Sequence, residues 1–238
     1  MKINHVSILM AMESEASPLI KILNLNRQDN TFRKGIPFET YQGHFENLLV
    51  TLITSGKDKD YQVDNIATQP ATLMAHLAIE RFRPDIIINA GTAGGLAQYG
   101  CKIGDVYLSE GEFCFHDRRI PIPGFDRYGV GSYPSIDPSF IAKKLSLKTG
   151  RISTGNSLDL TPKDLEVMKS NGAVVKEMEA AGIAWVCKIM STQVLAIKAI
   201  TDLIDVETLT EVQFSKNFLL ASNNLQKCVP KILNVLKT

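Results

Sequence analysis

The chain has few of the residues from which metal sites and disulfide frameworks are built. Its 238 residues include four cysteines and four histidines. The cysteines show neither C-x-x-C spacing nor the paired histidines of a zinc site. We therefore expect no metal, and we expect reduced, mostly buried thiols at Cys101, Cys114, Cys187 and Cys228.

Long hydrophobic runs and an excess of one charge are also absent. No stretch approaches the roughly 18 to 20 uninterrupted apolar residues of a transmembrane helix. The 26 basic and 25 acidic residues leave a net charge of +1, so the chain lacks the electrostatic footprint of a protein that binds nucleic acid or an anionic membrane. Glu13 and Glu15 close the first apolar run without an A-x-A-like cleavage signal, which favours a first strand and a cytoplasmic protein. The expected partner is a small molecule.

Hydrophobic periodicity predicts alternating strands and helices. The apolar content of 45% suits one α/β domain, residues 1–238, with a sizeable core. The alternation implies a mixed, mostly parallel central sheet flanked by helices, with right-handed crossovers. The last helix contains Pro230, which is expected to interrupt or kink it. Expected strands include residues 4–10, 47–54, 86–88, 103–108, 112–116, 151–154 and 194–202, and expected helices include residues 13–23, 68–82, 137–145 and 210–236.

The stretch DIIINAGTAGGL, residues 85–96, predicts the central strand and a loop after it. The β-branched run at 86–88 is typical of a strand buried on both faces. The glycines between 91 and 95 are expected to form a loop in which a ligand approaches the backbone around Thr92. The pattern is neither G-x-G-x-x-G nor a Walker P-loop, which disfavours dinucleotides and nucleoside triphosphates. Such a loop serves close packing about as often as ligand binding, so further residues must decide.

Polar residues follow four of the predicted strands, at Glu15, Thr92, Glu179 and Asp202. Taken alone, an acidic residue in a first helical turn commonly complements the helix dipole. Together, and all expected at the same carboxyl edge of the sheet, these residues predict an acid/base site without metal ligands. Carboxylates that stabilise a cationic, sugar-like transition state suit hydrolysis or transfer at a sugar carbon.

Two long segments lie outside this regular pattern. Residues 55–65 are polar and predict a solvated loop. Residues 115–134 mix aromatics, prolines and charges without periodicity, and a loop of that length favours a lid or an interface.

Four motifs, in family order, resemble those of the methylthioadenosine/S-adenosylhomocysteine nucleosidases of the nucleoside phosphorylase superfamily. They are AMESEA (11–16), NAGTAGG (89–95), KEMEAAGIA (176–184) and AITD (199–202). The stretches FHDRRIPIP and STGNSLD look most similar to plant-type 5′-methylthioadenosine nucleosidases. The resemblance implies a nucleoside phosphorylase-like fold and no cofactor. It also implies hydrolysis of the purine nucleoside 5′-methylthioadenosine to adenine and 5-methylthioribose, in methionine salvage. It leaves open whether S-adenosylhomocysteine is a substrate.

The resemblance also implies roles for the reacting groups. Glu15 matches the general base that activates the attacking water, with Thr92 and Lys198 placing that water. Asp202 matches the acid that protonates purine N7, so that adenine leaves neutral. To hold a proton near neutral pH, Asp202 needs a pKa well above its usual value of about 4. Thr201 is the candidate for orienting it.

Other residues are implied for substrate binding. Glu179 matches the residue that binds the ribose hydroxyls, with Met178 packed beside the ribose. The base is expected against the segment 157–159, with Leu158 in apolar contact and backbone groups up to Asp159 contacting the base edge.

The resemblance implies a homodimer in which a loop of the partner completes the pocket for the 5′-alkylthio group. Ile120 and Pro123 occupy the matching loop positions, and Met12 contributes from the same chain. Two positions differ from the family pattern. Asn156 stands where the family has Asp, which predicts a structural effect near the base pocket with activity retained. Lys198 replaces the Arg of bacterial members, as in plant-type members.

Two alternatives remain open on the sequence. The first is a phosphorylase that uses phosphate instead of water, which requires an anion site. The carboxylates of AMESEA would repel phosphate. The second is a non-catalytic nucleoside-binding or storage protein. Loss of a catalytic carboxylate would mark it, and Glu15, Glu179 and Asp202 are all present.

Overall fold

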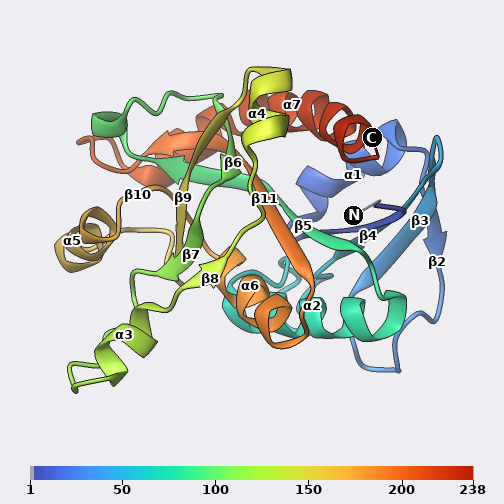
Figure 1. Cartoon of the computed structure of the whole chain (residues 1–238), viewed down its shortest axis with the longest axis horizontal. Coiled ribbons are helices and arrows are strands. Elements are labelled where there is room, and N and C mark those ends of the chain that lie inside the picture. Colours follow the sequence, from blue (N-terminus) through green and yellow to red (C-terminus); the bar gives the residue numbers. More distant parts are fainter. Residues whose placement is uncertain (1–2, 238) are drawn as a thin grey trace.

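The computed structural model describes residues 3–237, which form one mixed sheet with helices on both faces (Figure 1). The strands are β1 (His5–Met10), β2 (Asn26–Gln28), β3 (Glu39–Phe45), β4 (Leu48–Thr54), β5 (Ile86–Gly95), β6 (Val106–Ser109), β7 (Glu112–Phe115), β8 (Tyr133–Pro134), β9 (Lys148–Thr154), β10 (Ala173–Glu177) and β11 (Gln193–Leu203). The helices are α1 (Glu13–Ile22), α2 (Thr68–Phe82), α3 (Phe125–Val130), α4 (Ser139–Leu145), α5 (Pro162–Ser170), α6 (Ala180–Ile189) and α7 (Thr210–Leu236), with a short 3₁₀ turn at Ala97–Tyr99.

The strand order is β2-β3-β4-β1-β5-β11-β6-β9-β7-β8, and β10 pairs with both β5 and β9. Parallel pairing joins the central strands β4, β1, β5 and β11. Antiparallel pairs lie on both sides of them, between β3 and β4 and between β11 and β6. The predicted mixed α/β sheet flanked by helices is therefore confirmed. No helix within residues 3–237 combines the length and apolar character that crossing a membrane requires.

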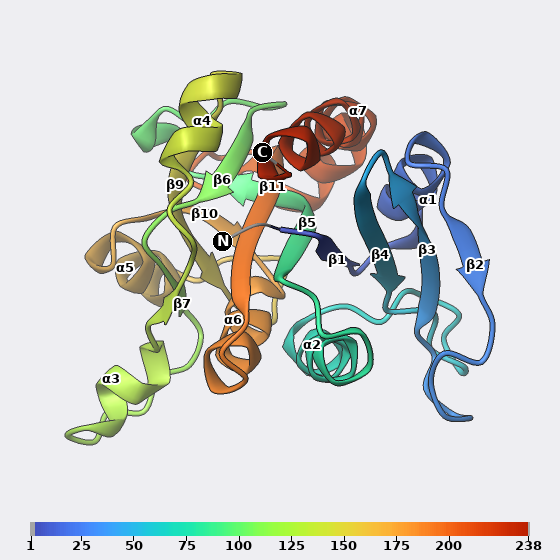
Figure 2. The ribbon, with the colours of Figure 1, turned by 45° about the vertical axis from the view of Figure 1, so that its right-hand side comes forward.

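Two hydrophobic layers fix this arrangement. Along β5, Ile87 packs with the side chains of α2 and α6, whereas Ile86 and Ile88 pack with those of α1, α4 and α7. Figures 1 and 2 show the two groups of helices on opposite faces of the sheet. Alternation with both faces buried explains the unbroken apolar run, since each successive side chain of a strand points to the opposite face.

The predicted glycine-rich loop is wrong, because β5 continues as a strand to Gly95. Its glycines make room for side chains from other elements. A Cβ on Gly91 would lie 3.1 Å from a carboxylate oxygen of Glu15, and one on Gly94 would lie 2.6 Å from Oδ2 of Asp202. The second distance is impossible for a real Cβ contact, so glycine at this position lets the Asp202 carboxylate lie against the strand.

The direction of β10 differs from the prediction of a single carboxyl edge. β10 runs antiparallel to β5, with Lys176 opposite Gly94. Residues after β10 therefore return toward the middle of β5. The prediction is wrong for Glu179, which reaches the other polar residues from the opposite direction.

The segment after β7 leaves the body of the protein. It contains α3 and β8, and both views show α3 projecting away from the sheet (Figures 1 and 2). α5 begins with the capping box of Thr161 and Asp164. α7 continues through Pro230, so this proline does not interrupt the helix.

Candidate active site

A cavity of about 670 Å³ lies beside the glycine-rich half of β5. It is lined by the β1–α1 junction, the end of β10 and the turn after it, the second half of β11, and part of the segment before α2. Among the predicted site residues, it is lined by Met12, Glu15, Thr92, Leu158, Met178, Glu179, Lys198, Thr201 and Asp202. The structure thus brings together residues that lie up to 190 positions apart along the chain, from Met12 to Asp202.

Three predicted residues are not among those lining the cavity. Asp159 is exposed to solvent just beyond Leu158. Ile120 and Pro123 lie on the segment that leads to the projecting α3. Within one chain they do not contact the cavity.

Glu15 is buried at the start of α1 and is held by Thr92. Its Oε1 accepts hydrogen bonds from the Thr92 backbone N–H at 2.8 Å and from the Thr92 hydroxyl at 2.6 Å. Burial raises the pKa of Glu15, although both hydrogen bonds and the Lys198 charge lower it. A carboxylate with a raised pKa and a fixed orientation is suited to accept a proton.

Lys198 lies between two glutamates and is itself fully buried. Its Nζ is 2.9 Å from Oε2 of Glu177 and 3.9 Å from Oε2 of Glu179. Glu177 also accepts hydrogen bonds from the backbone N–H groups of Glu179 and Ala180, at 3.0 and 2.8 Å, at the start of α6. These contacts hold the Glu177 carboxylate at the N-terminus of a helix, where anions are stabilised.

Glu179 faces the cavity with one oxygen anchored. Its Oε1 accepts a hydrogen bond from the backbone N–H of Ala67 at 3.1 Å. Burial and the Glu177 charge raise the pKa of Glu179 to about 7, against the opposing effect of Lys198. Glu179 therefore holds a proton more readily than an exposed glutamate does.

The side chain of Asp202 lies beside the Thr201 hydroxyl, which in turn lies beside the backbone carbonyl of Ala93. The Thr201 hydroxyl oxygen is 2.7 Å from Oδ1 of Asp202 and 3.2 Å from the carbonyl oxygen of Ala93. The Thr201 hydroxyl donates to Oδ1 of Asp202, which leaves Oδ2 to hold the carboxyl proton. Burial raises the pKa of Asp202, as the role of a proton donor requires.

Several residues of the cavity were missed from the sequence. Glu177 and Lys176 line it next to the predicted Met178 and Glu179, and Phe214 contributes from α7. The residues between Lys57 and Ile66, predicted to be mainly a solvated loop, also provide part of the wall. For Glu177 the signal was present, because it is the first glutamate of the E-M-E motif. For the loop between Lys57 and Ile66 there was no such signal, because a polar segment is typical of a solvated loop.

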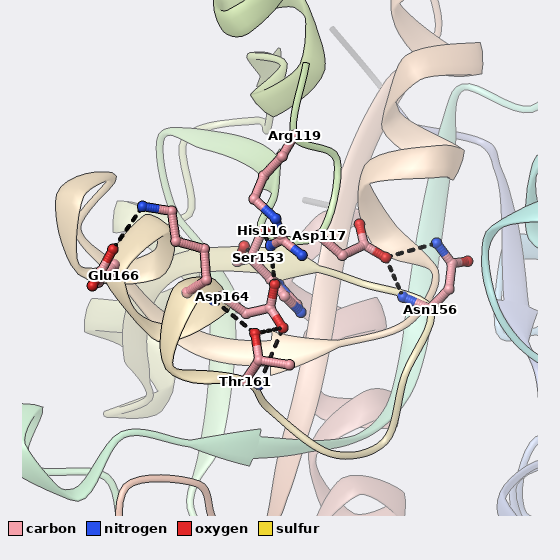
Figure 3. Close-up of polar contacts among 9 residues, drawn as sticks. His116, Asp117, Arg119, Ser153, Asn156, Thr161, Asp164 and Glu166 are labelled. Carbon is pink, nitrogen blue, oxygen red and sulfur yellow. Dashed lines mark hydrogen bonds and ion pairs between the residues drawn. The ribbon is translucent and has the colours of Figure 1, made fainter. Parts of the chain in front are cut away.

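Asn156 bridges two segments of the chain. Its backbone N–H and side-chain amide N–H both donate to Oδ2 of Asp117, at 2.7 and 3.0 Å (Figure 3). Its Oδ1 accepts from the backbone N–H and hydroxyl of Thr68, at 3.2 and 2.6 Å, at the start of α2. An aspartate at 156 would keep the acceptor but lose the donor to Asp117.

Replacing Asn156 with Asp is expected to lower the free energy of unfolding by about 1 kcal/mol near neutral pH, because one hydrogen bond is lost and two carboxylates adjoin. Any activity of the cavity should be nearly unchanged, since Asn156 does not line it. Thermal unfolding measures the effect, and the deficit should shrink in acid, where a protonated carboxyl can again donate to Asp117. Equal unfolding temperatures at all pH values would contradict this.

No group of three His, Cys, Asp or Glu side chains within residues 3–237 is arranged to hold a metal ion. Two buried carboxyl groups whose pKa values are raised by burial, Glu15 and Asp202, line the cavity.

Comparison with known proteins gives consistent matches along the chain. Residues 5–234 match the phosphorylase superfamily. The chain is 39% identical to a 5′-methylthioadenosine nucleosidase of Arabidopsis thaliana, over 98% of this chain and 87% of that one. It is 38% identical to a 5′-methylthioadenosine/S-adenosylhomocysteine nucleosidase of the same plant, over 98% and 91%. The solved structure of the Arabidopsis thaliana 5′-methylthioadenosine nucleosidase in apo form superposes with a TM-score of 0.96 at 38% identity, covering 99% of this chain and 97% of that one.

Proposed function

The chain belongs to the phosphorylase superfamily, and from that premise we propose that it hydrolyses the N-glycosidic bond of 5′-methylthioadenosine to adenine and 5-methylthioribose. The observation that carries this proposal is the placement of a buried base and a buried acid on one cavity, Glu15 and Asp202. The names of the two Arabidopsis relatives support the same substrate class. S-adenosylhomocysteine is the second candidate substrate.

Glu15 is the proposed general base. Thr92 engages its Oε1 twice, which leaves Oε2 to accept a proton from water. The hydroxide formed attacks C1 of the ribose as the bond from C1 to N9 breaks, and the electron pair of that bond passes to the adenine. Lys198 lowers the pKa of Glu15 through its charge, which keeps the base ionised to lower pH.

Asp202 is the proposed general acid. Its carboxyl proton moves to N7 of the purine, so that the base leaves as neutral adenine. The Thr201 hydroxyl fixes the carboxyl at 2.7 Å. Burial, which favours the neutral form, supports a proton donor at near-neutral pH.

Glu179 and Met178 are proposed to hold the ribose between these two groups. A glutamate carboxylate accepts hydrogen bonds from vicinal hydroxyls and stabilises the positive charge that develops on the sugar. Glu179 is restrained by its ion pair with Lys198 and by the hydrogen bond from its backbone N–H to Glu177, which itself pairs with Lys198. Leu158 and the backbone up to Asp159 are proposed to contact the adenine.

We further propose a homodimer in which Ile120 and Pro123 of a second copy, with Met12 of the first, complete the pocket for the 5′-alkylthio group. Apolar side chains on the α3 segment are exposed, namely Ile122, Phe125 and Tyr128. A second groove of about 530 Å³ lies between α2 and α6, and its lining includes the partly exposed Leu73, Trp185 and Ile189. Exposed apolar surface of this kind supports an interface between proteins. A cytoplasmic location and a place in methionine salvage complete the proposal.

Light scattering after gel filtration should give a mass of twice 26.3 kDa. Trp185→Glu should shift the protein toward the monomer and lower activity, because a charge cannot be buried unpaired at an interface. The matched control is Leu219→Glu, on α7, where an equally apolar side chain is exposed. A fully active monomer would contradict the shared pocket.

The test of the function is release of adenine from 5′-methylthioadenosine by the purified protein, with S-adenosylhomocysteine in a parallel reaction. Adenine is quantified by chromatography, and nucleoside binding is measured separately by calorimetry. We expect release of adenine. Binding of the nucleoside without release would instead support the storage or binding alternative.

A further inference from the structure

Lys176 is a buried cation of the cavity wall that has no role in the proposed reaction so far. It lies on β10, lines the same cavity as Asp202 and is 4% exposed. A buried ammonium group is costly unless its donors and its charge are satisfied. Its surroundings therefore indicate what it does.

The first contacts of Lys176 are with the segment proposed to hold the base. Its Nζ donates to the carbonyl oxygen of Ser157 at 2.7 Å and to that of Leu158 at 2.8 Å. Ser157 and Leu158 are exposed and lie between β9 and α5. Lys176 thus ties a surface loop to the rigid sheet through charge-assisted hydrogen bonds.

The second neighbour of Lys176 is Asp202. Lys176 is registered opposite Gly94 on one side of β5, and Asp202 is registered opposite the same Gly94 on the other side. Paired residues on neighbouring strands project to the same face of a sheet. Gly94 has no side chain, and Oδ2 of Asp202 occupies the space where its Cβ would be. The ammonium and the carboxyl group therefore face each other across a glycine.

We propose that Lys176 is a positioning residue for the proton transfer to the base. It holds the segment Ser157–Leu158 against the adenine and, across Gly94, stabilises the Asp202 carboxylate that remains once the proton has moved to N7. This inference rests on the proposed function, because it assumes that Asp202 donates a proton.

Other charges around Lys176 define its electrostatic setting. Burial lowers the pKa of Lys176, whereas the charges of Asp202, Asp159, Glu177 and Asp164 raise it. His116 faces it from the end of β7, and burial and the Lys176 charge lower the pKa of this histidine to about 4, so His116 is neutral at neutral pH. In return, Lys176 is the cation that lowers the pKa of Asp202 against the effect of burial.

The direction of the expected pH effect follows from these two opposing influences on the pKa of Asp202, burial and the charge of Lys176. Removing the ammonium lets burial raise the pKa of Asp202 further. The acid then stays protonated to higher pH but gives up its proton less readily. The alkaline limb of the pH profile of kcat/KM should move to higher pH by about one unit while kcat falls roughly tenfold or more.

The experiment measures kcat and KM for 5′-methylthioadenosine against pH for three variants of Lys176. Lys176→Met removes both the charge and the hydrogen bonds, Lys176→Gln removes the charge but keeps a donor for the two carbonyls, and Lys176→Arg keeps the charge. Lys148→Met is the matched control, because the Lys148 Nζ also donates to a carbonyl, that of Gly100 at 2.9 Å, outside the cavity.

We expect the alkaline limb to move in Lys176→Met and Lys176→Gln, to stay in place in Lys176→Arg, and to be unaffected in the control. A KM closer to that of the wild type in Lys176→Gln than in Lys176→Met would support the contact with the base segment. An unmoved limb in all three folded variants would overturn the proposal, even if KM rises, since a purely structural lysine predicts that result. Absence of adenine release by the wild type would instead contradict the proposed function.

Discussion

Glu15→Gln is expected to lower kcat for adenine release by roughly 10²–10⁴-fold, the usual contribution of a general base. The glutamine oxygen can still accept both hydrogen bonds from Thr92, which are 2.8 and 2.6 Å long in the native site. The substitution therefore removes the proton acceptor with little change of shape. KM should change much less than kcat, because the base acts on water and not on the bound nucleoside.

The matched control is Glu13→Gln. Glu13 lies in the same first turn of α1, but its side chain is half exposed and pairs with Lys57 at 3.3 Å. This variant should keep kcat near the wild-type value. If Glu15→Gln were as active as Glu13→Gln, water activation by Glu15 would be excluded.

Asp202→Asn is the second substitution with a large expected effect, again roughly 10²–10⁴-fold in kcat. Asparagine can form a hydrogen bond with the base but cannot transfer a proton to N7. Adenine would then have to leave as an anion. The loss should be smaller for a nucleoside analogue whose base leaves readily without protonation, which distinguishes a missing acid from a disturbed pocket.

Asp205→Asn serves as the control for Asp202. Its carboxylate accepts hydrogen bonds from the backbone N–H groups of Ala97 and Gln98 at 2.7 and 2.9 Å, outside the cavity. This variant should lose some stability but keep kcat near the wild-type value. Equal losses of kcat in Asp202→Asn and Asp205→Asn would show that the region is only structurally sensitive.

Both active-site carboxylates should also limit stability. Burial raises the pKa of Glu15 and of Asp202 in the folded state. Above the usual pKa of about 4, the folded state then binds more protons than the unfolded state, so their contribution to stability falls as pH rises toward the folded pKa values. Glu15→Gln and Asp202→Asn should therefore unfold at or above the wild-type temperature, which would show that the lost activity is not lost folding.

The sequence predicts best what local physics controls. The helix expected at residues 68–82 has those bounds in the structure, because its apolar spacing is helical and Pro84 follows it. The capping box that begins α5 is a second local feature, since Thr161 and Asp164 are three positions apart in the chain. In both cases neighbouring residues in the chain determine the outcome.

Long-range pairing explains what the sequence did not predict. Glycine occurs both in flexible loops and in strands that a side chain from another element approaches closely. Gly91 and Gly94 are of the second kind, and this is evident only once β5 is paired with β11. The antiparallel direction of β10 depends on its partners in the sheet. The sequence did not predict a role for Lys176 for the same reason, because Lys176 and Asp202 become neighbours only when their strands pair with β5.

The nature of the nucleophile is the central question, since a phosphorylase of this superfamily would use phosphate where the proposed mechanism uses water. A phosphate dianion needs hydrogen-bond donors that are not already paired with carboxylates, such as a free cationic group. Lys198 is the buried cation whose charge acts on Glu15, and it pairs with Glu177 at 2.9 Å and Glu179 at 3.9 Å. The Glu15 carboxylate would add repulsion. This charge arrangement favours water.

The most direct measurement is the identity of the sugar product when 5′-methylthioadenosine is converted with and without phosphate. Mass spectrometry of the products, with the rate of adenine release, distinguishes the two nucleophiles. We predict 5-methylthioribose in both buffers and a rate that does not depend on phosphate. Formation of 5-methylthioribose 1-phosphate, with a rate that rises with phosphate concentration, would contradict the assignment of Glu15 as the base for water.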